Sequence, residues 1–185
     1  MSRPIAPGDI EIPRNCEGCP YKDGPAVGTR GPVTSRIALV GEAPGVREIA
    51  DRKPFVGNAG GLLAGAARDA GLGFDRLFIT NSVACRPYPT PRPSARAIDA
   101  CRARLISDLS ASPRDVIVTL GTTAFRAATE QRVFRLADLR GRVHTSRWGR
   151  LIPTLHPARV LRIRSERDWL VSDLAMAGRL LTESS

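Results

Sequence analysis

Residues 36–45 read RIALVGEAPG, an apolar run that passes directly into a glycine-rich turn. A short apolar run bounded by turn residues is typical of a strand that is buried in a sheet. Three further runs of this kind lie at 77–80, 115–120 and 151–155. Pro153 interrupts the last run, which predicts an irregular strand or one at the edge of the sheet, because proline lacks an N–H for the strand ladder.

Helical patterns separate these runs. We expect helices at 59–70, from a Ser94 cap to about 109, from 122 to about 129 and at about 169–181. Strands that alternate with helices favour a parallel sheet with helices on both faces. The sequence therefore predicts one α/β domain over residues 1–185, a three-layer α/β/α sandwich around a central four-stranded, mainly parallel sheet. Residues 1–15 are rich in proline and are expected to form an irregular N-terminal arm.

The residues that follow the predicted strands carry much of the polar chemistry of the chain. Ligands of open parallel sheets bind beyond the carboxyl ends of the strands. In this chain those ends carry the glycine-rich turn at 41–45, Asn81, the segment 121–123 and His156. A carboxylate, an amide, closely approaching backbone and an imidazole are thus expected at one edge of the sheet, where together they would form a site.

The charge of the chain points to a polyanionic partner. The formal net charge is +10, and only Lys22 and Lys53 among the 28 basic residues are lysines. The planar guanidinium of arginine donates two hydrogen bonds to a phosphate at once, so nucleic acid is the first partner to consider. A biased codon composition is the plainer explanation for so much arginine.

The remaining composition fits a globular protein. Apolar residues make up 42% of the chain, an ordinary fraction for such proteins. No apolar run approaches the roughly 18–20 residues that cross a bilayer. The first residues, MSRPIAPGDIEIPRN, lack the apolar centre of a signal peptide. We therefore expect a cytoplasmic protein, in which stable disulfides are uncommon.

The thiols of the chain are Cys16, Cys19, Cys85 and Cys101. Four thiolates can bind zinc or a [4Fe–4S] cluster, and both centres use the C-x2-C spacing of the first pair. Fifteen residues separate Cys85 from Cys101, a spacing that fits a zinc knuckle poorly but suits a bulkier cluster. Cys101 also falls on the apolar face of its predicted helix. From the spacing, a cluster, a zinc ion and unrelated buried thiols all stay open.

Three segments together resemble one enzyme family. Residues 40–63, VGEAPGVREIADRKPFVGNAGGLL, resemble the first motif region of the family 4 uracil-DNA glycosylases. Residues 79–87, ITNSVACRP, resemble the second region, and residues 154–162, TLHPARVLR, resemble the third, a histidine-proline motif. The arrangement of the four cysteines is similar to the [4Fe–4S] site of that family. The resemblance extends from Cys16 to about Arg162.

The resemblance implies a uracil-DNA glycosylase-like fold and a DNA-repair enzyme. Such an enzyme hydrolyses the N-glycosidic bond of uracil with water as the nucleophile, which makes it a monofunctional glycosylase of base excision repair. The target nucleotide must first rotate out of the base stack into a pocket. The four cysteines would ligate a structural [4Fe–4S] cluster. We expect a monomer that acts on uracil-containing DNA, single- or double-stranded, with no membrane partner.

By resemblance, three residues handle the uracil ring. Phe55 would stack on the ring, Asn81 would read its edge, and His156 would donate a hydrogen bond to a carbonyl as negative charge develops there. Each residue also has a structural interpretation. Phe55 could be a core aromatic residue, Asn81 a strand-end amide and His156 a packed or capping imidazole.

Two carboxylates and the backbone of the turn complete the implied site. Glu42 would line the pocket, and Glu48 would orient the attacking water or stabilise the cationic sugar, although either could act as the base. Gly41 and Ala43 would let the backbone approach the substrate closely. The division of roles between the carboxylates stays open, and Glu48 could also be a solvated loop residue.

The resemblance further implies that the third motif faces DNA. Val160 or Leu161 would wedge into the gap that the flipped base leaves. Arg159 and Arg162 would hold flanking phosphates. Arg86, beside a proline-rich loop, is a further candidate for a DNA contact. The plainer interpretation of the third motif is a solvated arginine-rich helix.

Two departures from the family pattern keep other functions open. Ile49 stands where an aspartate is common, and the third motif reads HPAR in place of the more frequent HPS. One alternative is a glycosylase of the same fold that acts on another base, such as hypoxanthine or mispaired thymine. The other is a non-catalytic nucleic-acid-binding module that contains a cluster.

Overall fold

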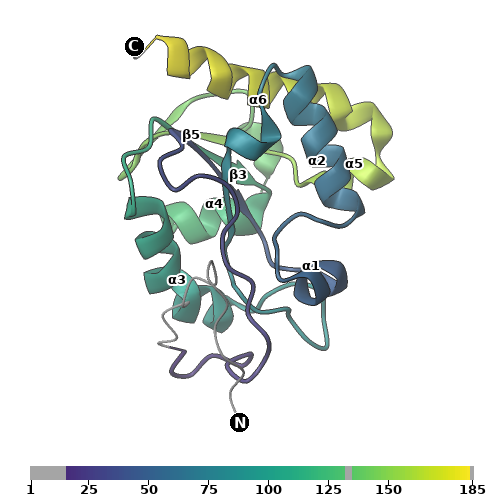
Figure 1. Cartoon of the computed structure of the whole chain (residues 1–185), viewed down its shortest axis with the longest axis vertical. Coiled ribbons are helices and arrows are strands. Elements are labelled where there is room, and N and C mark those ends of the chain that lie inside the picture. Colours follow the sequence, from purple (N-terminus) through teal and green to yellow (C-terminus); the bar gives the residue numbers. More distant parts are fainter. Residues whose placement is uncertain (1–15, 132–134, 184–185) are drawn as a thin grey trace.

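The computed structural model describes residues 16–131 and 135–183, and the irregular arm expected at 1–15 lies outside the described residues. The described residues form three layers, with a central sheet between helices that pack on both of its faces (Figure 1). This arrangement confirms the predicted α/β/α sandwich. No helix within the described ranges is long and apolar enough to cross a membrane.

In the described part of the chain, the sheet has five strands in the order β2-β1-β3-β5-β4. Their bounds are Ile37–Gly41 (β1), Phe78–Asn81 (β2), Val116–Leu120 (β3), His144–Ser146 (β4) and Gly149–Thr154 (β5). The four predicted strands correspond to β1, β2, β3 and β5, which are parallel. The fifth, β4, is antiparallel to β5 and escapes prediction because its three residues are only partly buried or exposed.

Pro153 lies in β5, an interior strand between β3 and β4, so β5 as a whole is not the predicted edge strand. At Pro153 itself, however, β5 is paired on one side only. β5 pairs with β3 through Thr154, but it pairs with β4 only over residues 149–151. The Thr154 carbonyl accepts a hydrogen bond from the Gly121 N–H at 2.8 Å, on the β3 side. Because neighbouring residues of a strand direct their backbone groups to opposite sides, Pro153 faces the side where β4 has already ended. Proline therefore interrupts no ladder bond there.

Helices and short 3₁₀ turns connect the strands. The α-helices are Val46–Asp51 (α1), Asn58–Asp69 (α2), Ala95–Ser110 (α3), Thr122–Thr129 (α4), Pro157–Arg162 (α5) and Arg167–Thr182 (α6). The 3₁₀ turns are Phe74–Arg76 (η1), Leu136–Asp138 (η2) and Arg164–Glu166 (η3).

The four predicted helices correspond to α2, α3, α4 and α6. Ser94 caps α3 as expected, because its hydroxyl accepts a hydrogen bond from the Ala97 N–H at 3.2 Å. Sequence periodicity does not predict α1 and α5, since each has six residues and makes less than two turns.

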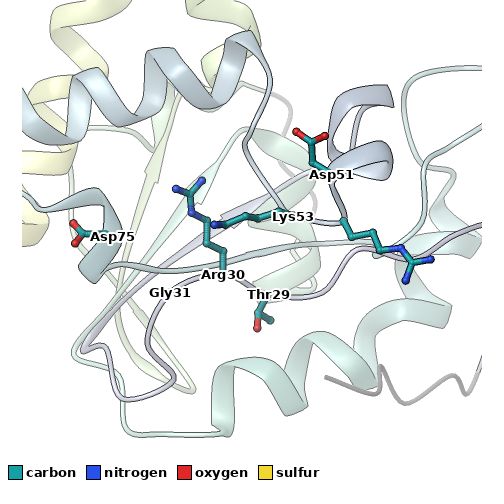
Figure 2. A pocket seen from close by; sticks show the side chains of 7 residues that line it. Thr29, Arg30, Gly31, Asp51, Lys53 and Asp75 are labelled. Atoms are coloured by element: carbon teal, nitrogen blue, oxygen red, sulfur yellow. The ribbon is translucent and has the colours of Figure 1, made fainter. Parts of the chain in front are cut away.

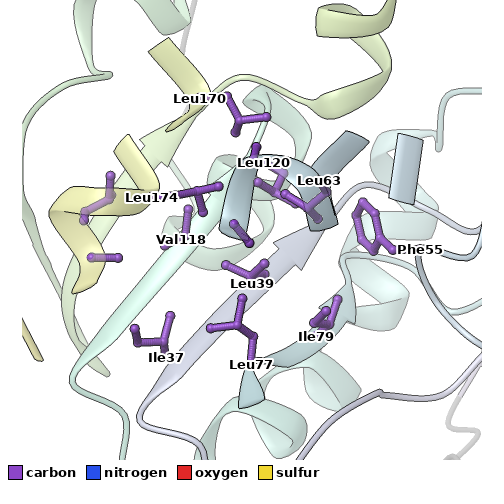
Figure 3. Close-up of a cluster of buried hydrophobic side chains, with 14 of the residues drawn as sticks. Ile37, Leu39, Phe55, Leu63, Leu77, Ile79, Val118, Leu120, Leu170 and Leu174 are labelled. Carbon is purple, nitrogen blue, oxygen red and sulfur yellow. The ribbon is translucent and has the colours of Figure 1, made fainter. Parts of the chain in front are cut away.

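Alternation of side chains along β1 builds a separate core on each face of the sheet. Ile37 and Leu39 pack with α2, α5 and α6, whereas Ala38 and Val40 pack with α3 and α4. Figure 3 shows the first of these cores, with Phe55 at its margin. Both cores pack against the same sheet, so the carboxyl ends of its strands remain available for a functional site.

Residues 26–31, here called the edge segment, run beside β2 at the outer edge of the sheet. Arg30 and Ile79 exchange both of their backbone hydrogen bonds, at 2.9 and 2.8 Å. Further along, the Val27 N–H donates to the Ala84 carbonyl at 2.8 Å. The chain that precedes β1 is therefore fixed to β2 and to the loop after it.

Candidate active site

The carboxyl ends of four strands bring predicted site residues together. Gly41 and Asn81 are partners in the register of β1 and β2. His156 follows β5, and a Cβ added to Gly121, just after β3, would lie 3.2 Å from the His156 Cβ. The expected convergence of the strand ends is confirmed, and it places an amide and an imidazole at the same edge of the sheet.

Gly41 lies at the most closely packed point of this edge. A Cβ on Gly41 would overlap Asn81 Oδ1 and would lie 2.6 Å from Phe55 Cζ. The Gly41 carbonyl accepts hydrogen bonds from the Ser82 N–H at 2.8 Å and from the Ser82 hydroxyl at 2.7 Å. The ring centroids of Phe55 and His156 are 6.3 Å apart, with their planes inclined by 35°. A side chain at position 41 would displace its neighbours, so the close approach requires glycine.

The Phe55 ring is held in a fixed position. Its backbone φ is 55°, a left-handed value that is uncommon for a residue other than glycine. The residue is 7% exposed. Gly60 makes room for it, since a Cβ there would overlap the Phe55 carbonyl oxygen. The Arg30 guanidinium donates to that carbonyl at 3.4 Å. The surrounding structure thus retains an unfavourable backbone conformation, and the ring is preorganised.

Glu48 ties together the two loops of the site. Its Oε2 accepts a hydrogen bond from the Gly45 N–H at 3.1 Å, at the start of α1. Its Oε1 accepts hydrogen bonds from the N–H groups of Val56 and Gly57, at 3.1 and 2.8 Å. Glu48 is therefore no solvated loop residue, because both of its oxygens join the glycine-rich turn to the residues that follow Phe55.

His156 caps α5 through one ring nitrogen and leaves the other to act as a donor. Nδ1 accepts a hydrogen bond from the Ala158 N–H at 3.1 Å. An accepting Nδ1 assigns the proton of the neutral ring to Nε2. Burial lowers the pKa of His156, the charge of Glu42 opposes this effect, and Arg162 adds to it. The neutral imidazole, with Nε2 as its donor, is thus the favoured form at pH 7.

Sequence reasoning missed Arg104, which supports Asn81 through its backbone. The Arg104 guanidinium, on α3, donates to the carbonyls of Asn81 and Ser82 and to the Thr80 hydroxyl, the last two at 3.3 and 3.0 Å. It also pairs with Asp108. Arg104 is 7% exposed, and a buried guanidinium needs such a set of partners. The one signal in the sequence is an arginine that directly precedes an apolar position of the α3 pattern.

The segments that carry the four cysteines meet against α3. Cys19 and Cys101 belong to one buried cluster, and Cys16 packs against it. Cys85 is paired with Ala26, which follows the C-x2-C pair along the chain. Cys19, Cys85 and Cys101 are almost fully buried. Cys16, Cys19 and Cys101 therefore share one core cluster, and Cys85 lies beside the segment that follows the C-x2-C pair.

Direct contacts also join the cysteine loop, which carries Cys16 and Cys19, to the start of α3. A Cβ on Gly18 would lie 3.1 Å from the Arg96 guanidinium. The Tyr21 hydroxyl accepts a hydrogen bond from the Ser94 N–H at 3.4 Å, and the Tyr21 N–H donates to Cys19 Sγ at the same distance. Within residues 16–131 and 135–183, no three side chains of histidine, cysteine, aspartate or glutamate are grouped as ligands of one metal ion.

The predicted DNA-facing segment forms α5, with one correction. Val160 is fully buried in the core and anchors α5 to the sheet, so the expected DNA contact of Val160 is wrong. Arg159 binds Glu166 through two hydrogen bonds, at 2.7 and 2.5 Å. Leu161 is partly buried and Arg162 is exposed. Leu161 and Arg162 therefore retain the surface that a DNA contact needs.

The loop between β2 and α3 presents basic and aromatic side chains to solvent. Arg86 and Arg92 are exposed, and Tyr88, which sequence reasoning missed, is 76% exposed. An aromatic side chain among arginines is typical of surfaces that stack on unpaired bases. The alternation of arginine, proline and tyrosine at 86–88 is the signal that could have identified it.

Comparisons with known proteins agree with this arrangement. Residues 29–175 match the family model of the uracil DNA glycosylase superfamily. The type-4 uracil-DNA glycosylase of Pyrobaculum aerophilum is 35% identical over 176 residues, which cover 90% of this chain and 89% of that protein. Proteins of the same name from Thermotoga maritima and Archaeoglobus fulgidus are 35% identical over 156 and 158 residues. These matches cover 82% and 79% of this chain, and 81% and 77% of the two relatives.

Proposed function

The chain belongs to the uracil DNA glycosylase superfamily and, within it, to the type-4 uracil-DNA glycosylases, and we propose accordingly that it excises uracil from DNA. The reaction is hydrolysis of the N-glycosidic bond by water, in base excision repair. The observation that carries the proposal is the convergence of Phe55, Asn81 and His156 around Gly41. A ring platform, an amide and a neutral donor are the groups that hold a flipped pyrimidine and stabilise it as a leaving group.

Recognition of uracil rests on stacking and on one amide. A uracil ring on Phe55 would present its polar edge to Asn81, whose side chain donates one hydrogen bond and accepts another. Uracil offers a carbonyl oxygen beside an N–H at that edge, whereas cytosine offers the reverse pattern. Arg104 holds the Asn81 backbone, which supports a fixed direction for the amide. Gly41 and Ala43 would contribute close backbone to the same pocket.

Bond cleavage leaves negative charge on uracil and positive charge on the sugar. The electron pair of the C–N bond passes to the uracil ring, where His156 Nε2–H donates to a carbonyl oxygen. Water adds to the sugar carbon through its oxygen, and the proton that it loses passes to the solvent, which balances the charge of the departing uracil anion. Stabilisation of developing charge by a preorganised donor is often the largest catalytic term. Glu42 is our candidate for orienting the attacking water, because the other carboxylate, Glu48, already accepts three backbone hydrogen bonds.

We assign Glu48 a positioning role, since its oxygens already accept three backbone hydrogen bonds. Glu48→Gln replaces one acceptor by a donor, so it should lower kcat about tenfold and destabilise the fold by ~1–3 kcal/mol. The shape of its pH–rate profile should stay that of the wild type. Loss of the limb that reports a catalytic base would instead identify Glu48 as that base.

We propose that Cys16, Cys19, Cys85 and Cys101 hold a [4Fe–4S] cluster. Four thiolates are the ligand set of such a cluster, and the burial of three of them supports this assignment. With four cysteine ligands the bound cluster supplies a cross-link and no open coordination position. Elemental analysis and visible absorption of the purified protein would test this proposal, and a stoichiometric content of zinc without iron would contradict it.

DNA would lie across Arg86, Leu161 and Arg162, with Leu161 in the gap left by the flipped nucleotide. The exposure of both arginines supports this orientation, as does the net charge of +10. Because both cores share one sheet, we propose that the chain acts as one domain, and as a monomer.

The proposed activity is tested with oligonucleotides that contain uracil, hypoxanthine or a G·T mispair, as single and double strands. Purified protein is added, and alkali then cleaves the abasic sites. We expect strand cleavage at uracil. Cleavage confined to hypoxanthine or to mispaired thymine would indicate another base specificity. Binding without any cleavage would indicate a non-catalytic module.

A further inference from the structure

A cavity of about 610 Å³ is lined by none of the residues assigned to the candidate active site at the strand ends (Figure 2). It is formed by the edge segment at 29–31, by residues 51–53 at and after the end of α1, and by Asp75 in η1. Three of the side chains that line it are cations, Arg30, Arg52 and Lys53. The proposed chemistry of base excision uses none of them.

The cations of this cavity lack acidic partners. Among the described residues, neither Arg52, Lys53 nor Arg30 has a carboxylate within ion-pair distance. Two carboxylates also line the cavity, Asp51, which pairs with Arg47 at 3.2 Å, and Asp75. Figure 2 shows that the side chains of Arg30 and Lys53 come from different segments that line the cavity. With three cations against two carboxylates, the lining carries a net positive charge, which favours an anion.

Arg30 is held ready for a ligand. Its backbone is paired with Ile79, and its guanidinium lies over the Phe74 ring, 4.7 Å from the centroid. One of its N–H groups donates to the Phe55 carbonyl at 3.4 Å. The guanidinium has five N–H donors in a fixed plane, so several remain for an anion. A group fixed in this way loses little conformational freedom when it binds.

The cavity lies beside the residue that we propose as the stacking platform. Arg30 contacts the Phe55 backbone directly, and Lys53 precedes Phe55 by two positions, a span of at most ~7 Å. We take the DNA strand whose flipped base rests on Phe55 to continue past these residues, and its phosphates carry one negative charge each.

We propose that this cavity binds a backbone phosphate of the DNA strand, with Arg30 and Lys53 as its ligands. The proposal rests on the proposed function, because it takes the ring of Phe55 as the place of the flipped base. The site adds a second anchor to the one proposed on α5. It would fix the position of the strand and would read no base.

The test measures binding of an oligonucleotide that carries an abasic-site analogue, by fluorescence anisotropy, over a series of salt concentrations. Lys53→Gln is the principal variant, because no contact of its side chain with another residue is described and the fold should be unaffected. Removing one phosphate contact should reduce the slope of log Kd against log salt by about 0.7–0.9, and should weaken binding about eightfold at ~0.1 M salt. Arg30→Gln should show the same change.

Arg179→Gln is the matched control, since it removes an exposed charge on α6 and should leave the slope unchanged. An unaltered slope for Lys53→Gln would overturn the proposal. The proposal would also be overturned if the cavity bound only free phosphate. In that case inorganic phosphate would raise the Tm of the wild type but not that of Lys53→Gln, while the salt slope of Lys53→Gln stayed unchanged. Uracil excision by the wild type is measured on the same preparation. Its absence would refute the proposed function, whereas the salt slope reports on the cavity separately.

Discussion

The strand-end pocket and the cysteine site are built in different ways, although Cys85 follows Asn81 by only four positions. In the pocket, backbone groups fix the geometry: Glu48 accepts three N–H bonds and the Gly41 carbonyl accepts two bonds from Ser82. In the cysteine site, Cys16, Cys19 and Cys101 belong to the core on the α3 side of the sheet, and Cys85 is held by its pairing with Ala26. The geometry of the pocket therefore depends on the sheet, whereas the cysteine site attaches segments outside the sheet to the body of the domain. Changes in one region should leave the other intact.

The largest effect is expected in the pocket. His156→Ala and Asn81→Ala should each lower the single-turnover rate of uracil excision by about 10²-fold or more, because each removes a group that acts on the uracil ring. Iron content should stay close to the wild-type value, and Tm should fall by only a few degrees, because His156→Ala also removes the cap of α5. A rate near the wild type would refute the assigned role, and a loss of iron would break the separation between the two regions.

Two glycines provide a sharper test of the pocket. Gly41→Ala should lower kcat/KM about 30-fold, because its Cβ would collide with Asn81 and Phe55. Gly61→Ala, on α2, is the matched control, since a Cβ there meets nothing within 4 Å. It should preserve activity and raise the stability by up to ~1 kcal/mol. Full activity of Gly41→Ala, measured by steady-state kinetics, would show that the close packing is unimportant.

The cysteine site should respond in stability more than in rate. Cys101→Ser should abolish iron binding and lower Tm by about 10 °C, on the scale of a ~3 kcal/mol cross-link. The folded fraction should still excise uracil within about fivefold of the wild-type rate at low temperature. Asp99→Asn, at an exposed position of the same helix, should change neither quantity. A rate loss as large as that of His156→Ala would place the cysteine site in the chemistry.

The smallest effect concerns the titration of His156. Burial lowers its pKa below the ordinary value of about 6.5. Its neutral form therefore stabilises the fold above pH ~6.5, and this contribution is lost as the pH falls towards the lowered pKa. Glu42→Gln should lower the pKa further and Arg162→Gln should raise it, because their charges act in opposite directions. NMR titration of the ring protons measures both shifts, and shifts of equal sign would contradict this account.

Much of the fold follows from local pattern. The buried runs that became β1, β2, β3 and β5 are apolar and short, and the α3 pattern carries its own cap at Ser94. Topology then places Asn81 and His156 at one edge before any contact is known. The helix α5 and the strand β4 are too short to show a period, and for the same reason Val160 could not be recognised as a core residue.

Other parts of the site depend on contacts between distant segments. Arg104 reaches the Asn81 carbonyl from a helix 23 positions away, and its place before an apolar position of the α3 pattern does not identify that carbonyl as its partner. Arg30 and Lys53 likewise come together only through the pairing of the edge segment with β2. Sequence motifs identify groups that touch a substrate, but the residues that hold those groups are identified by packing.

The edge segment has a consequence for solubility. β2 is the outermost strand of the sheet, and an uncovered outer strand is a template for pairing with other chains. The segment that covers it continues directly from the cysteine loop and is paired with Cys85 through Ala26. If the proposed cluster holds the loop of Cys16 and Cys19 in place, its removal should loosen this cover, and we expect the protein to aggregate before its helices melt. Light scattering and circular dichroism recorded during chelation would separate the two events, and helix loss that precedes scattering would argue against this order.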